Sequence, residues 1–323
     1  MKDISNGPIK VVFMGTPDFA LAPLASLIGS DFISVKAVVT QEDKPVGRKQ
    51  VLTSPPVKEI ADQFSIPVLQ PKRFKDNDEF LEELAEYSPD FIVVVAYGQI
   101  LPQEILDMAP FGAINIHGSL LPKYRGASPI EEALINGDTE TGITFMMMNE
   151  ELDSGDIILS ERIPIEKSDT SETLRKKLSF AAAAHLPFIL NDITEEVINP
   201  LPQDDSKATY CHKIKKEDGK IDLTEMTAEE ILNKIRAYAI WPQCYLVIDN
   251  KRLKILEAQI QQSSSCTPPA SYTKIDNDKI GLCTKKGLLL PTKVQLEGKN
   301  ITTIQDFLKG NEELFKKLPA KAK

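Results

Sequence analysis

The sequence predicts an α/β protein, with a doubly wound parallel sheet in its N-terminal part and a small β-barrel in its C-terminal part. Apolar runs that suit buried strands alternate with segments of helical spacing as far as residue 189. The segment 199–208, rich in proline and aspartate, ends this alternation, and short strand-like runs follow it. Because 323 residues suffice for two hydrophobic cores, we expect an N-terminal domain at 1–198, a linker at 199–208 and a C-terminal domain at 209–323.

The N-terminal domain begins with the pattern of a βαβ unit. Residues 9–14 form an apolar run that stops at Gly15-Thr16-Pro17, and helical spacing follows over 19–28. No G-x-G-x-x-G motif follows this strand, which disfavours a dinucleotide-dependent dehydrogenase. Residues 91–96 are entirely apolar, as in a strand buried on both faces of a parallel sheet. We also expect strands at 35–39, 66–69, 113–117, 142–148 and 155–165, and helices at 59–64, 78–87, 128–136 and 171–189.

A long segment without hydrophobic periodicity, residues 40–58, interrupts this series of elements. It contains three prolines and one glycine, and Lys44, Arg48 and Lys49 lie near its tip. A loop of this length inside an α/β domain is usually functional or disordered. The pattern leaves two interpretations open, a solvated loop or a mobile arm that contacts the substrate.

The C-terminal domain combines one amphipathic helix with short strands. Thr227 and Glu230 have the spacing of a capping box ahead of apolar residues at helical intervals, which predicts a helix over 227–239. Turn residues separate the apolar runs that follow, as in a small barrel. We expect strands there at 244–248, 253–258, 280–283 and 288–294.

Charge is distributed unevenly along the chain, whose formal net charge is −9. Residues 206–323 hold 21 Lys and Arg against 14 Asp and Glu, whereas residues 1–205 hold 17 against 33. The basic C-terminal region is either a solvated, lysine-rich surface or a face for a polyanion such as RNA.

The N-terminus and the cysteines indicate the cellular compartment and the metal content. Residues 1–8 lack the apolar stretch of a signal peptide and the arginine-rich character of a transit peptide, and the apolar runs are too short to span a bilayer. We therefore expect a cytoplasmic protein with no membrane partner. The four cysteines include no C-x-x-C pair, which disfavours a zinc site, and we predict no metal.

The strand at 113–117 carries the first candidate functional side chains. Side chains alternate along a strand, so Asn115 and His117 share one face. A loop with two prolines and the cations Lys123 and Arg125 follows them. Open α/β sheets bind ligands at the carboxyl ends of their strands. An alternative is a polar pair that is merely hydrogen-bonded in the core, but two such residues before this loop favour a binding site.

Several motifs, taken together, resemble the folate-dependent formyltransferase family. In the N-terminal part they are Gly15-Thr16-Pro17, Asn115 with His117, Ser119-Leu120-Leu121-Pro122, Arg125-Gly126 and Leu152-Asp153-Ser154-Gly155-Asp156. The C-terminal part resembles the branch of that family that acts on methionyl-tRNA. The motifs there are Ala208-Thr209-Tyr210, Lys213-Ile214, Arg236-Ala237-Tyr238, Trp241-Pro242, Gly298-Lys299 and Asp306-Phe307-Leu308.

This resemblance implies a Rossmann-like catalytic domain followed by an OB-like domain that binds tRNA. It implies that a formyl group passes from 10-formyltetrahydrofolate to the amine of initiator methionyl-tRNA during translation initiation, and we expect a monomer. Two alternatives share the fold, a formyltetrahydrofolate hydrolase and a sugar-nucleotide amine formyltransferase. A third is a non-catalytic RNA-binding protein on a decayed enzyme, which the intact Asn115, His117 and Asp153 disfavour.

The resemblance also assigns roles to individual residues. Asn115 would donate to the oxyanion, and a protonated His117 would donate a hydrogen bond and then a proton. Asp153 would favour the charged form of His117 and help remove the proton of the amine. The family match places folate near Ser119, Leu120, Leu121, Pro122, Tyr97, Gly98 and Asp156, and tRNA near Arg48, Lys44 and Lys49.

Overall fold

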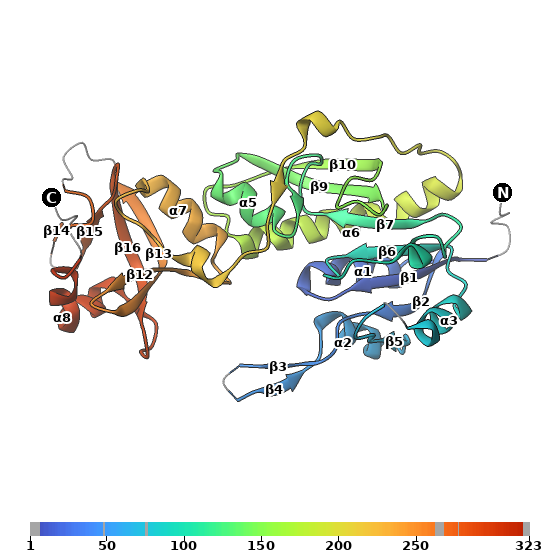
Figure 1. Ribbon diagram of the computed structural model, residues 1–323, viewed down its shortest axis with the longest axis horizontal. Helices are drawn as coiled ribbons and strands as arrows, with labels where there is room; N and C mark the ends of the chain where they lie inside the picture. The colour runs from blue at the N-terminus through green and yellow to red at the C-terminus, as the bar shows by residue number, and fades with distance from the viewer. Residues whose placement is uncertain (1–6, 48, 75–76, 262–267, 277, 319–323) are drawn as a thin grey trace. The chain divides into compact units, whose positions relative to one another are not determined.

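The computed structural model describes residues 7–47, 49–74, 77–261, 268–276 and 278–318 (Figure 1). The chain forms two compact units. The first unit consists of Met1–Pro129, Glu140–Pro164 and Arg175–Cys211. The second consists of Ile130–Thr139, Ile165–Leu174 and His212–Lys323.

The first unit is built on a seven-stranded sheet. Its strand order is β10 (Ile157–Pro164), β9 (Glu140–Met147), β7 (Ala113–His117), β6 (Phe91–Val95), β1 (Ile9–Gly15), β2 (Ile33–Val39) and β5 (Val68–Leu69). The five strands from β7 to β5 run parallel, whereas β9 is antiparallel to β7 and β10 is antiparallel to β9. The predicted doubly wound sheet is therefore confirmed.

Helices supply the apolar cover that a parallel sheet needs. All five residues of β6 are buried, as its uniformly apolar sequence predicts. Part of the core joins this sheet to Phe80, Leu84 and Ile105, which lie on two of the helices. The helical elements of the first unit are η2 (Asp18–Ala20), α1 (Leu21–Ile28), α2 (Pro56–Gln63), α3 (Asp78–Glu86), α4 (Gln103–Leu106), most of α6 (Ser171–Thr194) and η3 (Asp205–Lys207).

The segment 40–58 contains a β-hairpin that the sequence analysis did not predict. Strands β3 (Lys44–Val46) and β4 (Val51–Thr53) pair antiparallel, and every residue in them is exposed. Figure 1 shows the hairpin extending away from the sheet of the first unit. Three-residue strands are too short to show an alternating pattern, which explains why the sequence indicated only a loop.

The segment 199–208, predicted as a linker, belongs to the first unit and is hydrogen-bonded to other parts of it. Leu201 pairs with Ile157, and Gln203 and Asp205 accept hydrogen bonds from Arg125. A short parallel pair, β8 (Arg125–Gly126) with β11 (Tyr210–Cys211), follows. The predicted domain boundaries themselves stay a prediction.

The second unit is an antiparallel β-domain, which confirms the predicted change of architecture. Its strands follow the order β12 (Cys244–Ile248), β13 (Lys251–Gln261), β16 (Leu288–Leu296), β15 (Ile280–Cys283) and β14 (Tyr272–Lys274), and β17 (Thr302–Thr303) pairs with β16. The predicted capping box is present, because Thr227 and Glu230 exchange hydrogen bonds ahead of helix α7. The helical elements are α5 (Pro129–Ile135), η4 (Lys216–Gly219), α7 (Ala228–Ala237) and α8 (Ile304–Phe315).

Within the described ranges, no helix combines the length and the apolar character needed to cross a bilayer.

Candidate active site

Strand β7 carries Asn115 and His117 to the carboxyl end of the parallel sheet. Asn115 is paired with Val94 of β6 and with Met146 of β9, so the strand is fixed on both sides. His117 is buried, and Asn115 is partly buried on the same face. The two polar side chains therefore occupy the edge where open α/β sheets bind ligands.

Asp153 brings these two residues into one cluster. It lies on the turn between β9 and β10, and its Oδ2 is 3.7 Å from Nδ1 of His117. Its Oδ1 accepts a long hydrogen bond of 3.5 Å from Nδ2 of Asn115. The side chains of His117 and Asp153 are only 6% and 13% exposed. The structure thus brings together all three residues expected to be catalytic.

Both ring nitrogens of His117 face oxygen acceptors. Nε2 is 2.9 Å from the carbonyl oxygen of Tyr124, and Nδ1 faces Asp153. Only Nε2 lies within hydrogen-bond distance of its acceptor, because 3.7 Å between Nδ1 and Oδ2 of Asp153 is too long for a hydrogen bond.

The loop after β7 is held by Thr144 of the neighbouring strand β9. The hydroxyl of Thr144 donates to the carbonyl of Ser119 at 2.7 Å and accepts from the N–H of Leu121 at 3.1 Å. Ser119 and Leu121 are buried, and Leu120 and Pro122 are partly buried. Four of the predicted folate residues therefore form one ordered loop beside His117.

Two glycines allow the backbone to approach closely around Asp153. A Cβ on Gly126 would lie 2.1 Å from the carbonyl oxygen of Cys211, and its φ is +121°. A Cβ on Gly155 would lie 1.7 Å from the carbonyl oxygen of Met147. The N–H of Gly126 donates to Oδ2 of Asp153 at 2.8 Å. Only glycine fits at either position, which explains why both sequence motifs contain glycine there.

The turn after β6 adjoins a separate hollow. The carbonyl of Tyr97 accepts from Oγ1 of Thr16 at 3.3 Å and from Nε2 of Gln41 at 3.0 Å. The Tyr97 ring packs 5.7 Å from the ring of Phe74. Burial raises the pKa of Tyr97 above its usual value, and within the described part of the chain its hydroxyl has no hydrogen-bond partner.

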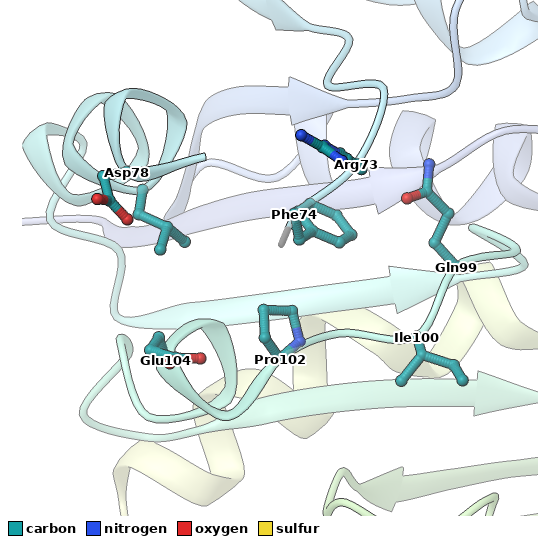
Figure 2. A pocket seen from close by; sticks show the side chains of 8 residues that line it. Arg73, Phe74, Asp78, Gln99, Ile100, Pro102 and Glu104 are labelled. Atoms are coloured by element: carbon teal, nitrogen blue, oxygen red, sulfur yellow. The ribbon is translucent and has the colours of Figure 1, made fainter. Parts of the chain in front are cut away.

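Phe74 also lines a cavity of about 870 Å³ (Figure 2). Figure 2 shows Arg73 and Phe74 on the segment before α3, and Gln99, Ile100 and Pro102 on the segment after β6. The remaining lining residues are Asp78, Leu81 and Glu104. One of the two segments that line the cavity thus begins directly after Gly98 in the chain. The sequence analysis did not reveal the cavity, because the two lining segments are separate in sequence.

Three of the other predicted site residues are exposed. Asp156 is exposed, and its backbone carbonyl accepts from the N–H of Met147. Lys44 and Lys49 are exposed on the hairpin segment, where Nζ of Lys44 donates to Oε1 of Gln41. Arg48 lies outside the described residues. The roles of these four residues stay predictions.

Two family models match this chain over most of its length. A model described as formyl transferase matches residues 9–190, and one described as formyl transferase, C-terminal domain, matches residues 213–312. The chain belongs to the formyl transferase family. Asn115, His117 and Asp153 of this formyl transferase all lie within the first match.

Named relatives are similar to nearly the whole formyl transferase chain. A methionyl-tRNA formyltransferase of Caldicellulosiruptor saccharolyticus is 46% identical over 302 residues, 93% of this chain and 96% of the relative. One of Desulfotalea psychrophila is 44% identical over 303 residues, 94% of this chain and 93% of the relative.

A solved structure extends the comparison to the fold. WlaRD, a sugar 3N-formyl transferase in the presence of dTDP and 5-N-formyl-THF, matches with a TM-score of 0.64 at 20% identity. The match covers 90% of this chain and 99% of WlaRD. At this level of identity the likeness shows the fold alone.

The candidate site also contains a residue that the sequence analysis missed. Gln203, in the segment predicted as a linker, donates from Nε2 to the carbonyls of Asp153 and Gly155. Its Oε1 accepts from the guanidinium of Arg125, which is 3% exposed. Burial opposes the charge of Arg125, but hydrogen bonds with Asp205 and Tyr210 outweigh this effect and raise its pKa. Nothing in the composition of 199–208 distinguished Gln203 from its polar neighbours.

Proposed function

We propose that this enzyme transfers the formyl group of 10-formyltetrahydrofolate to the amine of initiator methionyl-tRNA. The cluster of Asn115, His117 and Asp153 carries the proposal. The carboxylate of Asp153 lies 3.5 Å from the amide nitrogen of Asn115 and 3.7 Å from Nδ1 of the His117 imidazole. Relatives that bear this activity in their names match more than nine-tenths of the chain. Translation initiation uses this product, so the proposal includes a cytoplasmic location.

The three residues divide the chemistry among them. The methionyl amine attacks the formyl carbon, and a new C–N bond creates a tetrahedral oxyanion. Asn115 and the imidazolium of His117 stabilise that oxyanion as hydrogen-bond donors. The carboxylate of Asp153 accepts the proton that the attacking amine loses, directly or through a water.

Collapse of the intermediate completes the transfer. The bond from the formyl carbon to N10 of the folate breaks, and His117 supplies the proton that N10 takes up. The long 3.5 Å contact from Asn115 to Asp153 leaves the amide free to turn toward the oxyanion. All three groups come from one chain, so we expect a monomer to be active.

Folate is proposed to lie along the turn at Tyr97-Gly98 and the loop 119–122. The cavity beside this turn suits the remainder of such a molecule, since Phe74 and Ile100 offer apolar surface to an aromatic ring. Arg73, in the same lining, offers a cation to a carboxylate. Resident metal chemistry is not part of this proposal.

The tRNA is proposed to contact the hairpin at 44–53 and the basic C-terminal region. Lys44, Arg48 and Lys49 supply cations on the hairpin segment, and residues 206–323 carry an excess of seven cations. Lysine and arginine bind the phosphate backbone without reading sequence. Choice of the initiator therefore requires further contacts to the acceptor end.

The two enzymatic alternatives, release of formate and transfer to a sugar-nucleotide amine, use the same three catalytic residues. They are disfavoured because the likeness to the sugar 3N-formyl transferase shows only the fold, whereas the named tRNA enzymes match at 44–46% identity.

Formyl transfer from 10-formyltetrahydrofolate to initiator methionyl-tRNA tests this directly. Elongator methionyl-tRNA, a sugar-nucleotide amine and a reaction without acceptor serve as comparisons. We expect fast transfer to the initiator alone. Formate release that does not depend on tRNA would contradict the proposal and support the hydrolase.

A further inference from the structure

We propose that Gln203 is a positioning residue that ties the buried Arg125 to the turn carrying Asp153. The inference rests on the proposed function, in which Asp153 takes the proton of the amine. Gln203 makes no contact with His117 or Asn115 in the hydrogen bonds of the described residues, so it acts through Asp153.

The turn at Asp153 is held by hydrogen bonds from outside it. Asp153 has a φ of +49°, in the left-handed region that non-glycine residues adopt uncommonly. Such conformations persist where the surroundings over-determine them. The Nε2 group of Gln203 donates to the carbonyl of Asp153 at 2.9 Å and to that of Gly155 at 2.8 Å. One side-chain amide therefore spans the turn and uses both of its protons.

Arg125 fixes which way this amide points. Its Nε and Nη2 donate to Oε1 of Gln203 at 3.1 and 2.8 Å. A flipped amide would place its NH₂ group against the guanidinium and its oxygen against two carbonyls. Arg125 therefore enforces the orientation in which Gln203 donates to the turn.

Arg125 is itself anchored, and its neighbour holds the carboxylate. Nη2 of Arg125 donates to Oδ1 of Asp205 at 2.6 Å, and β8 pairs with β11. The next residue, Gly126, donates its N–H to Oδ2 of Asp153 at 2.8 Å. The dipeptide Arg125-Gly126 thus holds the side chain of Asp153 through the N–H of Gly126. It holds the backbone of Asp153 indirectly, through Gln203.

This closed set of hydrogen bonds sets the distance between Asp153 and His117. Oδ2 of Asp153 lies 3.7 Å from Nδ1 of His117, close enough to tighten when substrate binds. A displacement of about 1 Å at a reacting group can reduce a rate by about 100-fold. Gln203 is therefore needed for the rate of transfer and not for the binding of either substrate.

The test compares Gln203→Glu and Gln203→Met with the wild-type enzyme. Glutamate still accepts from Arg125 but cannot donate to the two carbonyls, whereas methionine has similar length and makes neither contact. We expect kcat to fall about 100-fold in both, with KM for each substrate within about twofold. Amide exchange at Gly126 should accelerate, because its acceptor Asp153 moves.

Gln103 provides controls in the first unit, because its Nε2 also donates a hydrogen bond, to Oδ1 of Asp107 at 2.7 Å. Gln103→Glu and Gln103→Met should leave kcat and the Gly126 exchange unchanged. Thermal unfolding of every variant reports whether it is folded.

Three results would overturn the proposal. They are a folded Gln203 variant with kcat near the wild-type value, a loss carried by KM alone, and unfolding of both Gln203 variants. A wild-type enzyme that does not formylate methionyl-tRNA would instead refute the proposed function. In that case the exchange rate at Gly126 still decides whether Gln203 positions Asp153.

Discussion

At the scale of single residues, the carboxylate of Asp153 joins groups that are far apart in sequence. It contacts Asn115 and His117 on β7 through side-chain atoms, and Gly126 through a backbone N–H. Each oxygen therefore has a defined partner, and the turn is further held through its carbonyls. A single substitution here should separate chemistry from binding.

Replacing His117 by alanine should abolish formyl transfer while folate and tRNA binding persist. The variant loses both an oxyanion donor and the proton that N10 takes up, and such groups contribute about 100-fold to 10,000-fold each. Single-turnover rates and equilibrium binding of each substrate measure the two effects separately. Turnover near the wild-type rate would contradict the mechanism.

Gly126→Ala should destabilise the first unit by about 2 kcal/mol or more, because the new Cβ meets a carbonyl and the left-handed φ is strained. Gly310 in α8 is the matched control, since nothing lies within 4 Å of its Cβ position. Gly310→Ala should stabilise the protein by about 0.5–1 kcal/mol. Chemical denaturation measures both changes, and equal effects would refute this account.

At the scale of secondary-structure elements, the structure shows which local sequence signals are sufficient to predict an element. The capping box of α7 forms as its spacing predicts, with Thr227 and Glu230 bonded in both directions. The hairpin β3–β4 has no comparable signal, yet Lys44 and Lys49 of this segment are exposed to solvent. Both elements lead to measurable expectations.

The capping box should make stability depend on pH through Glu230. Its backbone hydrogen bond from Thr227 lowers the pKa of Glu230 below the ordinary value of 4.5. The stabilisation is therefore present at neutral pH and is lost as the pH falls below that value. Glu230→Ala should lower the free energy of unfolding at pH 7 and have a smaller effect near pH 3, whereas Glu229→Ala in the same turn should show a smaller dependence. An equal effect of Glu230→Ala at both pH values would rule out this role.

Arg48→Ala should impair the use of tRNA far more than the binding of folate. The substitution removes a cation from the hairpin segment, which lies apart from the catalytic cluster in sequence. A plot of the logarithm of tRNA affinity against the logarithm of salt concentration has a slope that counts phosphate contacts. Lys44→Ala and Lys49→Ala should each reduce this slope by about one. Equal loss of tRNA and folate affinity in the Arg48 variant would exclude the hairpin from tRNA recognition.

At the scale of the whole molecule, the chain combines an acidic N-terminal part with a basic C-terminal part. Because the cations are in excess in the C-terminal part, a protein with a net charge of −9 can still offer a basic surface to a polyanion. This distribution suits an enzyme whose reacting groups lie in the first unit and whose acceptor is a large nucleic acid.

Affinity for tRNA should therefore fall steeply with salt despite the negative net charge. Several released counterions imply a loss of roughly tenfold or more between 50 and 200 mM salt. Folate affinity, measured on the same samples, should change much less because it depends on few charges. A tRNA affinity that is insensitive to salt would show that the basic region does not face the nucleic acid.

The sequence by itself determined the seven sheet strands of the first unit, the change from α/β to antiparallel β, and the family motifs. Hydrophobic periodicity and glycine or proline turns are local properties, so they could be read without the structure. Asn115 and His117 could be paired because strand alternation alone places them on one face. Asp153 was assigned only through the family resemblance.

Only the tertiary structure decided how distant residues meet. The contacts of Asp153 with β7 join positions 36 or more residues apart, and those of Gln203 join positions about 50 and 78 apart. The cavity at Phe74 and the role of the segment 199–208 likewise depend on packing between separate segments. No local sequence pattern predicts such long-range contacts, because they follow from how the sheet, its loops and the buried Arg125 pack together.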